Sequence, residues 1–123
     1  LPMEESGHLK MIAEATSPFP QFDIFYSSGH TDKMMIPKIR YKDRVVCFVA
    51  DLIPSSAHIP IPYVMGYDTR PLMSMEEKQR FLNEAAEKNY VLFFEHDPLV
   101  ECCTVRNTEK GIRLDNAFKL SEL

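Results

Sequence analysis

Six consecutive apolar residues at 45–50, mostly β-branched or aromatic, run directly into Asp51. A second apolar run at 90–94 is followed by Glu95 and His96. Unbroken apolar runs of this length are typical of strands at the centre of a sheet, where both faces are buried. The pattern therefore predicts two central strands, each followed by polar residues at its end.

Shorter runs predict the remaining strands. A strand at 22–26 is expected to stop at Ser27 to Thr31, where small residues allow a sharp turn that presents His30. The runs 34–41 and 44–50 predict a hairpin, because the two residues between them suit a tight turn. Further strands are expected at 7–12, 99–105 and 112–114.

Prolines mark the predicted loops. Pro18 and Pro20 withhold backbone donors, so a loop is expected at 17–20. Residues 52–73 contain four prolines, which excludes a helix or a central strand there. Loops of this length and stiffness shape cavities or partner surfaces.

One main helix is expected at about residues 74–89. Ser74 and Glu77 have the spacing of a capping box, and helix-forming residues continue to Lys88. Phe81, Leu82 and Ala85 form the stripe expected to face the core. Together, the strands and this helix predict an α+β fold with a mainly antiparallel sheet.

Composition narrows the class of protein. The chain has 123 residues, 45% hydrophobic and 26% charged, which is the balance of one globular domain. No apolar run approaches the roughly 20 residues of a membrane span, and a net charge of -4 offers no basic surface for phosphates. We therefore expect neither nucleic acid nor membrane as a partner. Three cysteines without disulfide or zinc spacing suggest reduced thiols in a cytoplasmic protein.

Three of the predicted strands end in residues that can bind a metal ion, namely His30, Asp51 and His96. If these strands point the same way in one sheet, the three side chains meet at one edge. Two imidazoles and a carboxylate suit zinc, iron or manganese, and a cation would compensate a half-buried Asp51. Histidines at strand ends also serve purely as hydrogen-bonding groups, and spacing alone leaves both interpretations open.

Sequence motifs at these positions resemble those of a known family. Gly29-His30-Thr31, Asp51-Leu52-Ile53-Pro54 and Phe94-Glu95-His96-Asp97-Pro98 are similar, in order and spacing, to three motifs of the metallo-β-lactamase-fold hydrolases. The resemblance implies half of an αβ/βα sandwich with a metal centre, often dinuclear zinc, between two sheets. It also implies that His30 binds the first metal, Asp51 bridges both and His96 binds the second.

The family's earlier motif, H-x-H-x-D-H, is absent from residues 1–123. The resemblance therefore implies a C-terminal half, with the remaining ligands and the acid/base aspartate in an upstream half that acts as partner. The chain begins with Leu1, which permits a trimmed tag or a piece of a longer polypeptide, and the motifs favour the second. Alone, this half is expected to be inactive, to hold no metal and to form homo-oligomers.

The function expected of the complete protein is hydrolysis of a small-molecule substrate by water activated at the metal centre. His58 and Tyr67 of the loop 52–73 are candidates to touch the substrate, although ordinary loop packing also accounts for them. The alternative is a non-catalytic assembly lobe that oligomerises through an exposed sheet face. Redox chemistry at Cys102 and Cys103 ranks last, because adjacent strand residues point to opposite faces.

Overall fold

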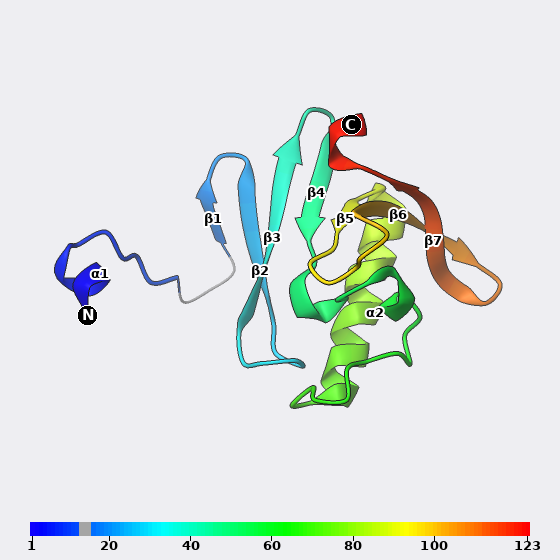
Figure 1. Cartoon of the computed structure of the whole chain (residues 1–123), viewed down its shortest axis with the longest axis horizontal. Helices are drawn as coiled ribbons and strands as arrows, with labels where there is room; N and C mark the ends of the chain where they lie inside the picture. The colour runs from blue at the N-terminus through cyan, green and yellow to red at the C-terminus, as the bar shows by residue number, and fades with distance from the viewer. Residues whose placement is uncertain (13–15) are drawn as a thin grey trace.

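The structure, a computed structural model, describes residues 1–12 and 16–123, and one sheet lies at its centre (Figure 1). Seven strands follow one another across this sheet in sequence order. All neighbouring pairs are antiparallel except β4 and β5, which are parallel. This confirms the predicted mainly antiparallel sheet. The strands are β1 Thr16–Phe19, β2 Phe22–Ser27, β3 Met34–Tyr41, β4 Arg44–Phe48, β5 Val91–Phe93, β6 Cys102–Thr108 and β7 Gly111–Phe118.

The main helix, α2, spans Pro71–Lys88 and lies against one face of the sheet (Figure 1). It belongs to the connection between β4 and β5, because parallel neighbours need a crossover. Two short 3-10 turns, η1 Ala50–Leu52 and η2 Ser56–His58, precede it in the same connection. Neither α2 nor any other described helix is long and apolar enough to cross a membrane.

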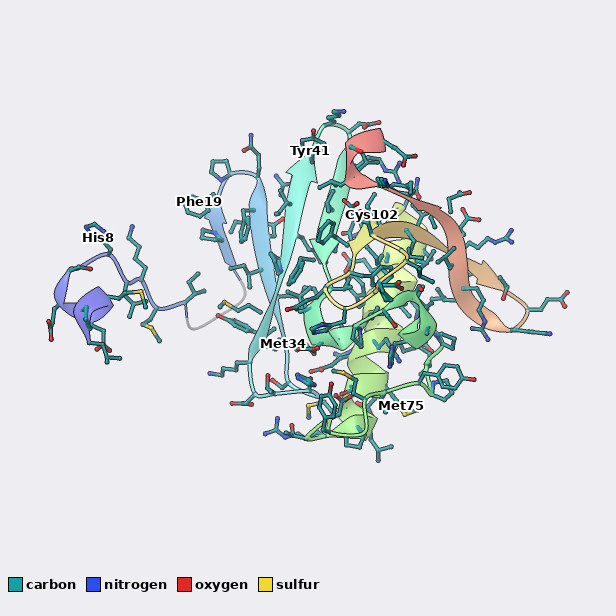
Figure 2. The ribbon with its side chains drawn as sticks, viewed as in Figure 1. His8, Phe19, Met34, Tyr41, Met75 and Cys102 are labelled. Atoms are coloured by element: carbon teal, nitrogen blue, oxygen red, sulfur yellow. The ribbon has the colours of Figure 1, made fainter. Side chains whose placement is uncertain are left out.

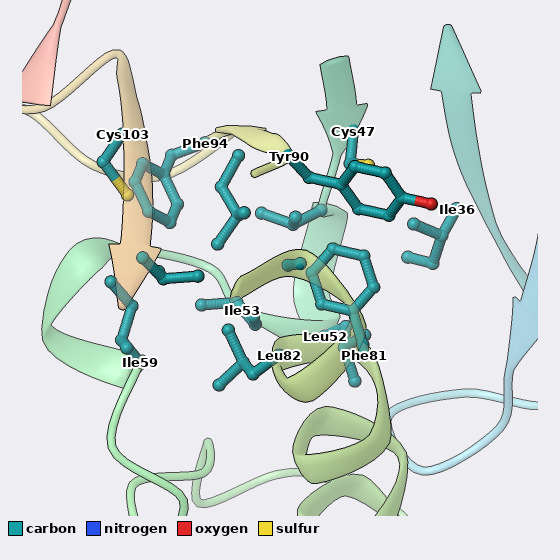
Figure 3. Close-up of a cluster of buried hydrophobic side chains, with 14 of the residues drawn as sticks. Ile36, Cys47, Leu52, Ile53, Ile59, Phe81, Leu82, Tyr90, Phe94 and Cys103 are labelled. Atoms are coloured by element: carbon teal, nitrogen blue, oxygen red, sulfur yellow. The ribbon is translucent and has the colours of Figure 1, made fainter. Parts of the chain in front are cut away.

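The hydrophobic core lies between α2 and the sheet (Figure 3). The predicted stripe of Phe81, Leu82 and Ala85 is buried there, and the Phe25 ring stacks on Phe81 with centroids 5.6 Å apart. Burial of each large apolar side chain contributes about 1.5–3 kcal/mol. The strands and loops add Ile36, Cys47, Ile53, Ile59, Leu92 and Cys103 to this core.

The strands β2, β4 and β5 run in the same direction, because β3 is antiparallel to both β2 and β4 while β5 is parallel to β4. Their last residues are Ser27, Phe48 and Phe93. The segments that follow these strands therefore leave the sheet along one edge. The sequence analysis required three strands that point the same way in one sheet, and β2, β4 and β5 do so.

The start of α2 differs from the prediction. The helix begins at Pro71, with Arg70 as N-cap, rather than with a cap at Ser74. Proline is favoured in the first turn, because its missing N–H would have no helical partner there. Ser74 consequently lies inside the helix, where it is buried and its hydroxyl has no partner in the described part of the chain. The predicted end is correct, with Asn89 in the left-handed conformation at φ 54°.

The outer strands on the two sides of the sheet also differ from the prediction. Residues 16–19 form a strand despite Pro18, because an edge strand tolerates a residue without an N–H donor. The strand predicted at 7–12 is wrong, since those residues are irregular and follow a short helix, α1 Pro2–Glu5, that lies apart from the sheet (Figure 1). At the opposite edge, β6 starts later and β7 runs longer than predicted.

The sheet face that α2 leaves open carries exposed apolar side chains. Phe19, Met35, Ile39 and Tyr41 are 37% to 67% exposed there, and Figure 2 labels Phe19 and Tyr41 on β1 and β3. Farther along the same face, the C-terminal segment with η3 (Leu120–Glu122) packs against buried residues of β4, β5 and β6. Only part of this face is therefore covered by the described chain.

Glu84 fastens α2 to β3. Its carboxylate accepts hydrogen bonds from Lys38 of β3, from Lys88 and from the Tyr90 hydroxyl at 2.8–2.9 Å. Burial raises the pKa of Glu84, but the three hydrogen bonds outweigh burial and lower the pKa from 4.5 to about 2. The ionised carboxylate is therefore favoured in the folded chain.

Acid is expected to weaken the fold between pH 4.5 and pH 2. In this window the unfolded chain binds a proton at Glu84 that the folded chain does not, so the stability present above pH 4.5 is lost toward pH 2. Glu84→Gln should lower the free energy of unfolding near neutral pH and flatten its decrease in acid, as measured by urea titration. The exposed Glu87→Gln on the same helix is the control. Equal acid slopes for wild type and Glu84→Gln would contradict this role.

Candidate metal centre

Three polar side chains meet at the edge where β2, β4 and β5 end. The Nε2 atom of His30 lies 3.4 Å from Oδ2 of Asp51, and the Nε2 atom of His96 lies 3.3 Å from Oδ1 of the same carboxylate. Each imidazole thus faces a different oxygen of Asp51. The structure therefore brings together the three residues that the sequence nominated as metal ligands.

The turn that carries His30 is held by α2. Glu77 accepts hydrogen bonds from the main-chain N–H groups of Ser28 and Gly29 and from the Ser27 hydroxyl, at 2.8–3.0 Å. Two successive N–H groups directed at one carboxylate form a small anion-binding turn. Glu77 therefore fixes the backbone immediately before His30.

The segment that leads into α2 holds the same turn from the other side. The Arg70 N–H donates to the Gly29 carbonyl at 2.8 Å, and the Thr69 hydroxyl donates to the His30 carbonyl at 2.9 Å. Gly29 itself packs directly on the helix, because a Cβ added to it would lie 2.5 Å from the Ser74 Cα. The turn and the helix start therefore position each other.

Asp68 sets the orientation of the His30 imidazole. Its Oδ1 lies 2.9 Å from Nδ1 of His30, and the Asp68 side chain is 3% exposed. Because an ionised carboxylate only accepts hydrogen bonds, Nδ1 donates to Asp68, and Nε2 is the ring nitrogen that faces Asp51. The Tyr67 ring packs edge-on against the imidazole, with centroids 6.0 Å apart. His30 is thus held with Nε2 directed at Asp51.

Asp51 follows a sharp turn at the end of β4. The Val49 N–H donates to the Phe93 carbonyl at 3.1 Å, which continues the pairing of β4 with β5. Ala50 then adopts a φ of 42°, a left-handed conformation that alanine rarely takes. The strained turn starts η1 and takes the chain out of the sheet at Asp51.

The loop after β5 carries His96. The His96 N–H donates to the Pro54 carbonyl at 3.1 Å. Asp97 accepts hydrogen bonds from the N–H and hydroxyl of Ser56 and from the N–H groups of residues 99–100, at 2.5–2.9 Å. Burial raises the pKa of Asp97, but these bonds prevail and lower the pKa to about 2. This charged side chain ties the His96 loop to the loop after Asp51.

Glu95 adds a carboxylate that the sequence pattern did not nominate. Asp51, Glu95 and His96 each offer a ligand atom, and these atoms lie within 4.8 Å of one another. Oε1 of Glu95 is 4.0 Å from Nε2 of His96. In the sequence, only its position next to His96 indicated that Glu95 lies near the candidate ligands.

The spacing of the donor atoms fits a divalent cation. Ligand atoms on one tetrahedral zinc ion are about 3.3–3.6 Å apart, because the bonds are about 2.0–2.2 Å long. The two histidine-to-Asp51 distances, 3.4 and 3.3 Å, fall in this range. They are longer than the roughly 2.7–2.9 Å of a hydrogen bond between charged groups. Two imidazole nitrogens and a carboxylate suit zinc, and iron or manganese as well.

A pocket of about 410 Å³ lies beside these residues, with His96 and Ser55 in its lining. Both residues that the sequence nominated in the long loop, His58 and Tyr67, line the same pocket. Nδ1 of His58 is 2.8 Å from the Ser55 hydroxyl oxygen. Burial and the nearby Lys78 lower the pKa of His58, so its imidazole is neutral at pH 7.

Comparison with known proteins finds similarity in structure only. No family model matches the chain, and no curated protein does. A probable metal-dependent hydrolase from Staphylococcus aureus is similar over 96% of this chain, with a TM-score of 0.79 and 24% identity. AbOPH, a hydrolase in the beta-lactamase superfamily, is similar over 96% of this chain, with a TM-score of 0.78 and 16% identity. AidC, a dizinc quorum-quenching lactonase, is similar over 92% of this chain, with a TM-score of 0.75 and 20% identity.

The similarity shows the fold. The sheet with its single main helix matches half of a metallo-β-lactamase fold, as the sequence motifs predicted. The match covers 42%, 42% and 40% of the three solved chains. This chain thus spans about two fifths of the length of the structures it resembles.

Proposed function

We propose that residues 1–123 form the C-terminal lobe of a metal-dependent hydrolase, in which His30, Asp51 and His96 hold part of a dinuclear metal centre. The observation that carries the proposal is that the two histidines face the two oxygens of Asp51, at 3.4 and 3.3 Å. This arrangement suits a carboxylate that bridges two cations. When bound, the cations would lower the pKa of water toward neutrality and polarise a carbonyl or phosphoryl oxygen.

The chain's own contribution is to hold three ligands ready. Asp68 keeps the proton of His30 on Nδ1, which leaves Nε2 available. Asp97 fixes the loop that carries His96. Zinc is the metal we propose, with iron or manganese as alternatives, because the donors are imidazole and carboxylate. The acid/base aspartate and the remaining ligands would come from chain outside residues 1–123.

The substrate is proposed to bind in the pocket beside His96. The neutral imidazole of His58 and the phenol of Tyr67 can each form a hydrogen bond with an ester, lactone or phosphoester. Val64 and Met65 give the same pocket an apolar side. Lactones are the first substrate class to test, since AidC, one of the structural neighbours, is a lactonase.

The open sheet face is proposed to receive the other half of the domain. Phe19, Met35, Ile39 and Tyr41 expose an apolar surface there, and an uncovered surface of this kind favours association. The same surface supports the second candidate function, a non-catalytic lobe that assembles with copies of itself. The metal measurement below separates the two.

The test measures the metal content of the full-length protein and its hydrolysis of a panel of lactones, thioesters and phosphodiesters. His30→Ala and His96→Ala are each expected to lower metal affinity by more than about 100-fold, because even groups behind the ligands are worth about 10–100-fold. His8→Ala, an exposed histidine in the N-terminal segment, is the matched control. Wild-type protein that binds no metal, hydrolyses nothing on the panel and self-associates would favour the assembly lobe.

A further inference from the structure

Lys78 of α2 is a buried lysine that is turned into the protein. Its side chain is among the largest fully buried ones, with the residue 1% exposed. Its ammonium nitrogen donates hydrogen bonds to the carbonyl oxygens of His58, Pro60 and Tyr63, at 2.9, 3.2 and 2.6 Å. An ammonium group has three N–H donors, so all of them are used by the main chain of one loop.

The energetics explain why this group stays buried. Removing an ammonium ion from water is costly unless hydrogen bonds compensate it, and the three carbonyls supply that compensation. Burial lowers the pKa of Lys78 to about 8, while the charge of Asp68 acts in the opposite direction. The carbonyls gain as well, because residues 59–63 form no helix or strand. Of the three, the Pro60 carbonyl also accepts a turn hydrogen bond from the Tyr63 N–H, at 3.0 Å.

The loop held by Lys78 forms one side of the pocket. His58 lies at one end of the bonded segment, and the residues directly after Tyr63 continue the lining as far as Tyr67. A shift of residues 58–63 would therefore move both His58 and Tyr67 relative to His96. Neither side chain needs to touch Lys78 for this to happen.

We propose that Lys78 is a positioning residue: by binding three carbonyl oxygens of residues 58–63, it fixes where the loop places His58 and Tyr67 in the pocket beside His96. The role assigned to the pocket rests on the proposed function, whereas the placement of the loop does not. A second effect accompanies it, since the positive charge of Lys78 helps to keep the neighbouring His58 imidazole neutral.

The test replaces Lys78 by methionine in the full-length protein and follows hydrogen exchange of the loop amides. The His58 and Tyr63 carbonyls would lose their hydrogen bond to the ammonium group and the Pro60 carbonyl would lose one of its two, so exchange at 58–67 should become at least about tenfold faster. The free energy of global unfolding, measured in urea, should fall far less than the free energy of local opening of this loop. The reason is that an apolar side chain replaces a buried charge. The pKa of His58, followed by NMR, should rise in Lys78→Met and stay low in Lys78→Arg. Arg80→Met, at an exposed position of the same helix, is the control.

Two results would overturn the proposal. The first is that Lys78→Met has the same rate of amide hydrogen exchange in the loop, and the same His58 pKa, as wild type. The other applies if Lys78→Met does not fold: the wild-type Lys78 ammonium should then show NMR couplings across its hydrogen bonds to carbonyl carbons of residues 58–63, and their absence would contradict it. Metal content is measured on the same wild-type sample, so failure of the proposed function is recognised separately.

Discussion

Asp51→Asn is expected to reduce the proposed metal binding and hydrolysis by the full-length protein more than any other single substitution. The carboxylate lies between His30 and His96 and offers one oxygen to each. An amide keeps the shape of the side chain but has one acceptor oxygen and no charge. We expect metal affinity to fall by more than about 100-fold, beyond the effect of groups that only support ligands. Isothermal titration with zinc and metal analysis after dialysis measure this directly.

Asp43→Asn provides the control for this prediction. Asp43 lies in the exposed hairpin turn between β3 and β4, at the end of β4 opposite to Asp51. The substitution makes the same chemical change, and zinc binding should equal that of wild type. If Asp51→Asn retained wild-type zinc affinity and activity, Asp51 would not be a metal ligand.

Gly29→Ala is expected to cause the largest loss of stability. The added methyl group would lie 2.5 Å from the Ser74 Cα and closer still to its nitrogen, so the turn or the helix start must move. Because backbone cannot rotate away as a side chain can, we expect a loss of roughly 3 kcal/mol or more in the free energy of unfolding. Urea denaturation measures it. The displaced turn also carries His30, so zinc affinity should fall in parallel.

Gly66→Ala is the matched control, because a Cβ at Gly66 would meet nothing within 4 Å. It should change stability by no more than about 0.5 kcal/mol. If Gly29→Ala were as stable as Gly66→Ala, the turn would have room to relax and the contact with Ser74 would not fix His30.

The central part of the fold was predictable because apolar runs report burial on both faces of a strand. The runs at 45–50 and 90–94 mark β4 and β5, and the polar residues after them mark the end of the sheet where the candidate metal site lies. Asp51 and His96 follow these two runs, and His30 follows the strand predicted at 22–26. The resemblance of the three motifs to one family is what favoured them together as metal ligands. Edge strands depend on pairing rather than on burial, and for this reason β1 and the full length of β7 were missed.

The supporting residues could not be predicted, because their roles depend on contacts across the fold. Glu77 has the spacing of a capping-box residue, yet its carboxylate binds the turn before His30. Asp68 lay in a loop without any pattern that linked it to His30. Lys78 did leave a signal, since it precedes Phe81 and Leu82 by one helical turn and so falls on the buried stripe. A charged residue on that stripe indicates an internal partner.

The most direct test of the metal centre is a crystal structure of the full-length protein grown with zinc, with diffraction data collected on both sides of the zinc absorption edge. The account predicts two peaks of anomalous density, one within about 2.0–2.2 Å of His30 Nε2 and Asp51 Oδ2 and one within the same distance of His96 Nε2 and Asp51 Oδ1. Anomalous density elsewhere on the protein, with these three side chains free of metal, would contradict it.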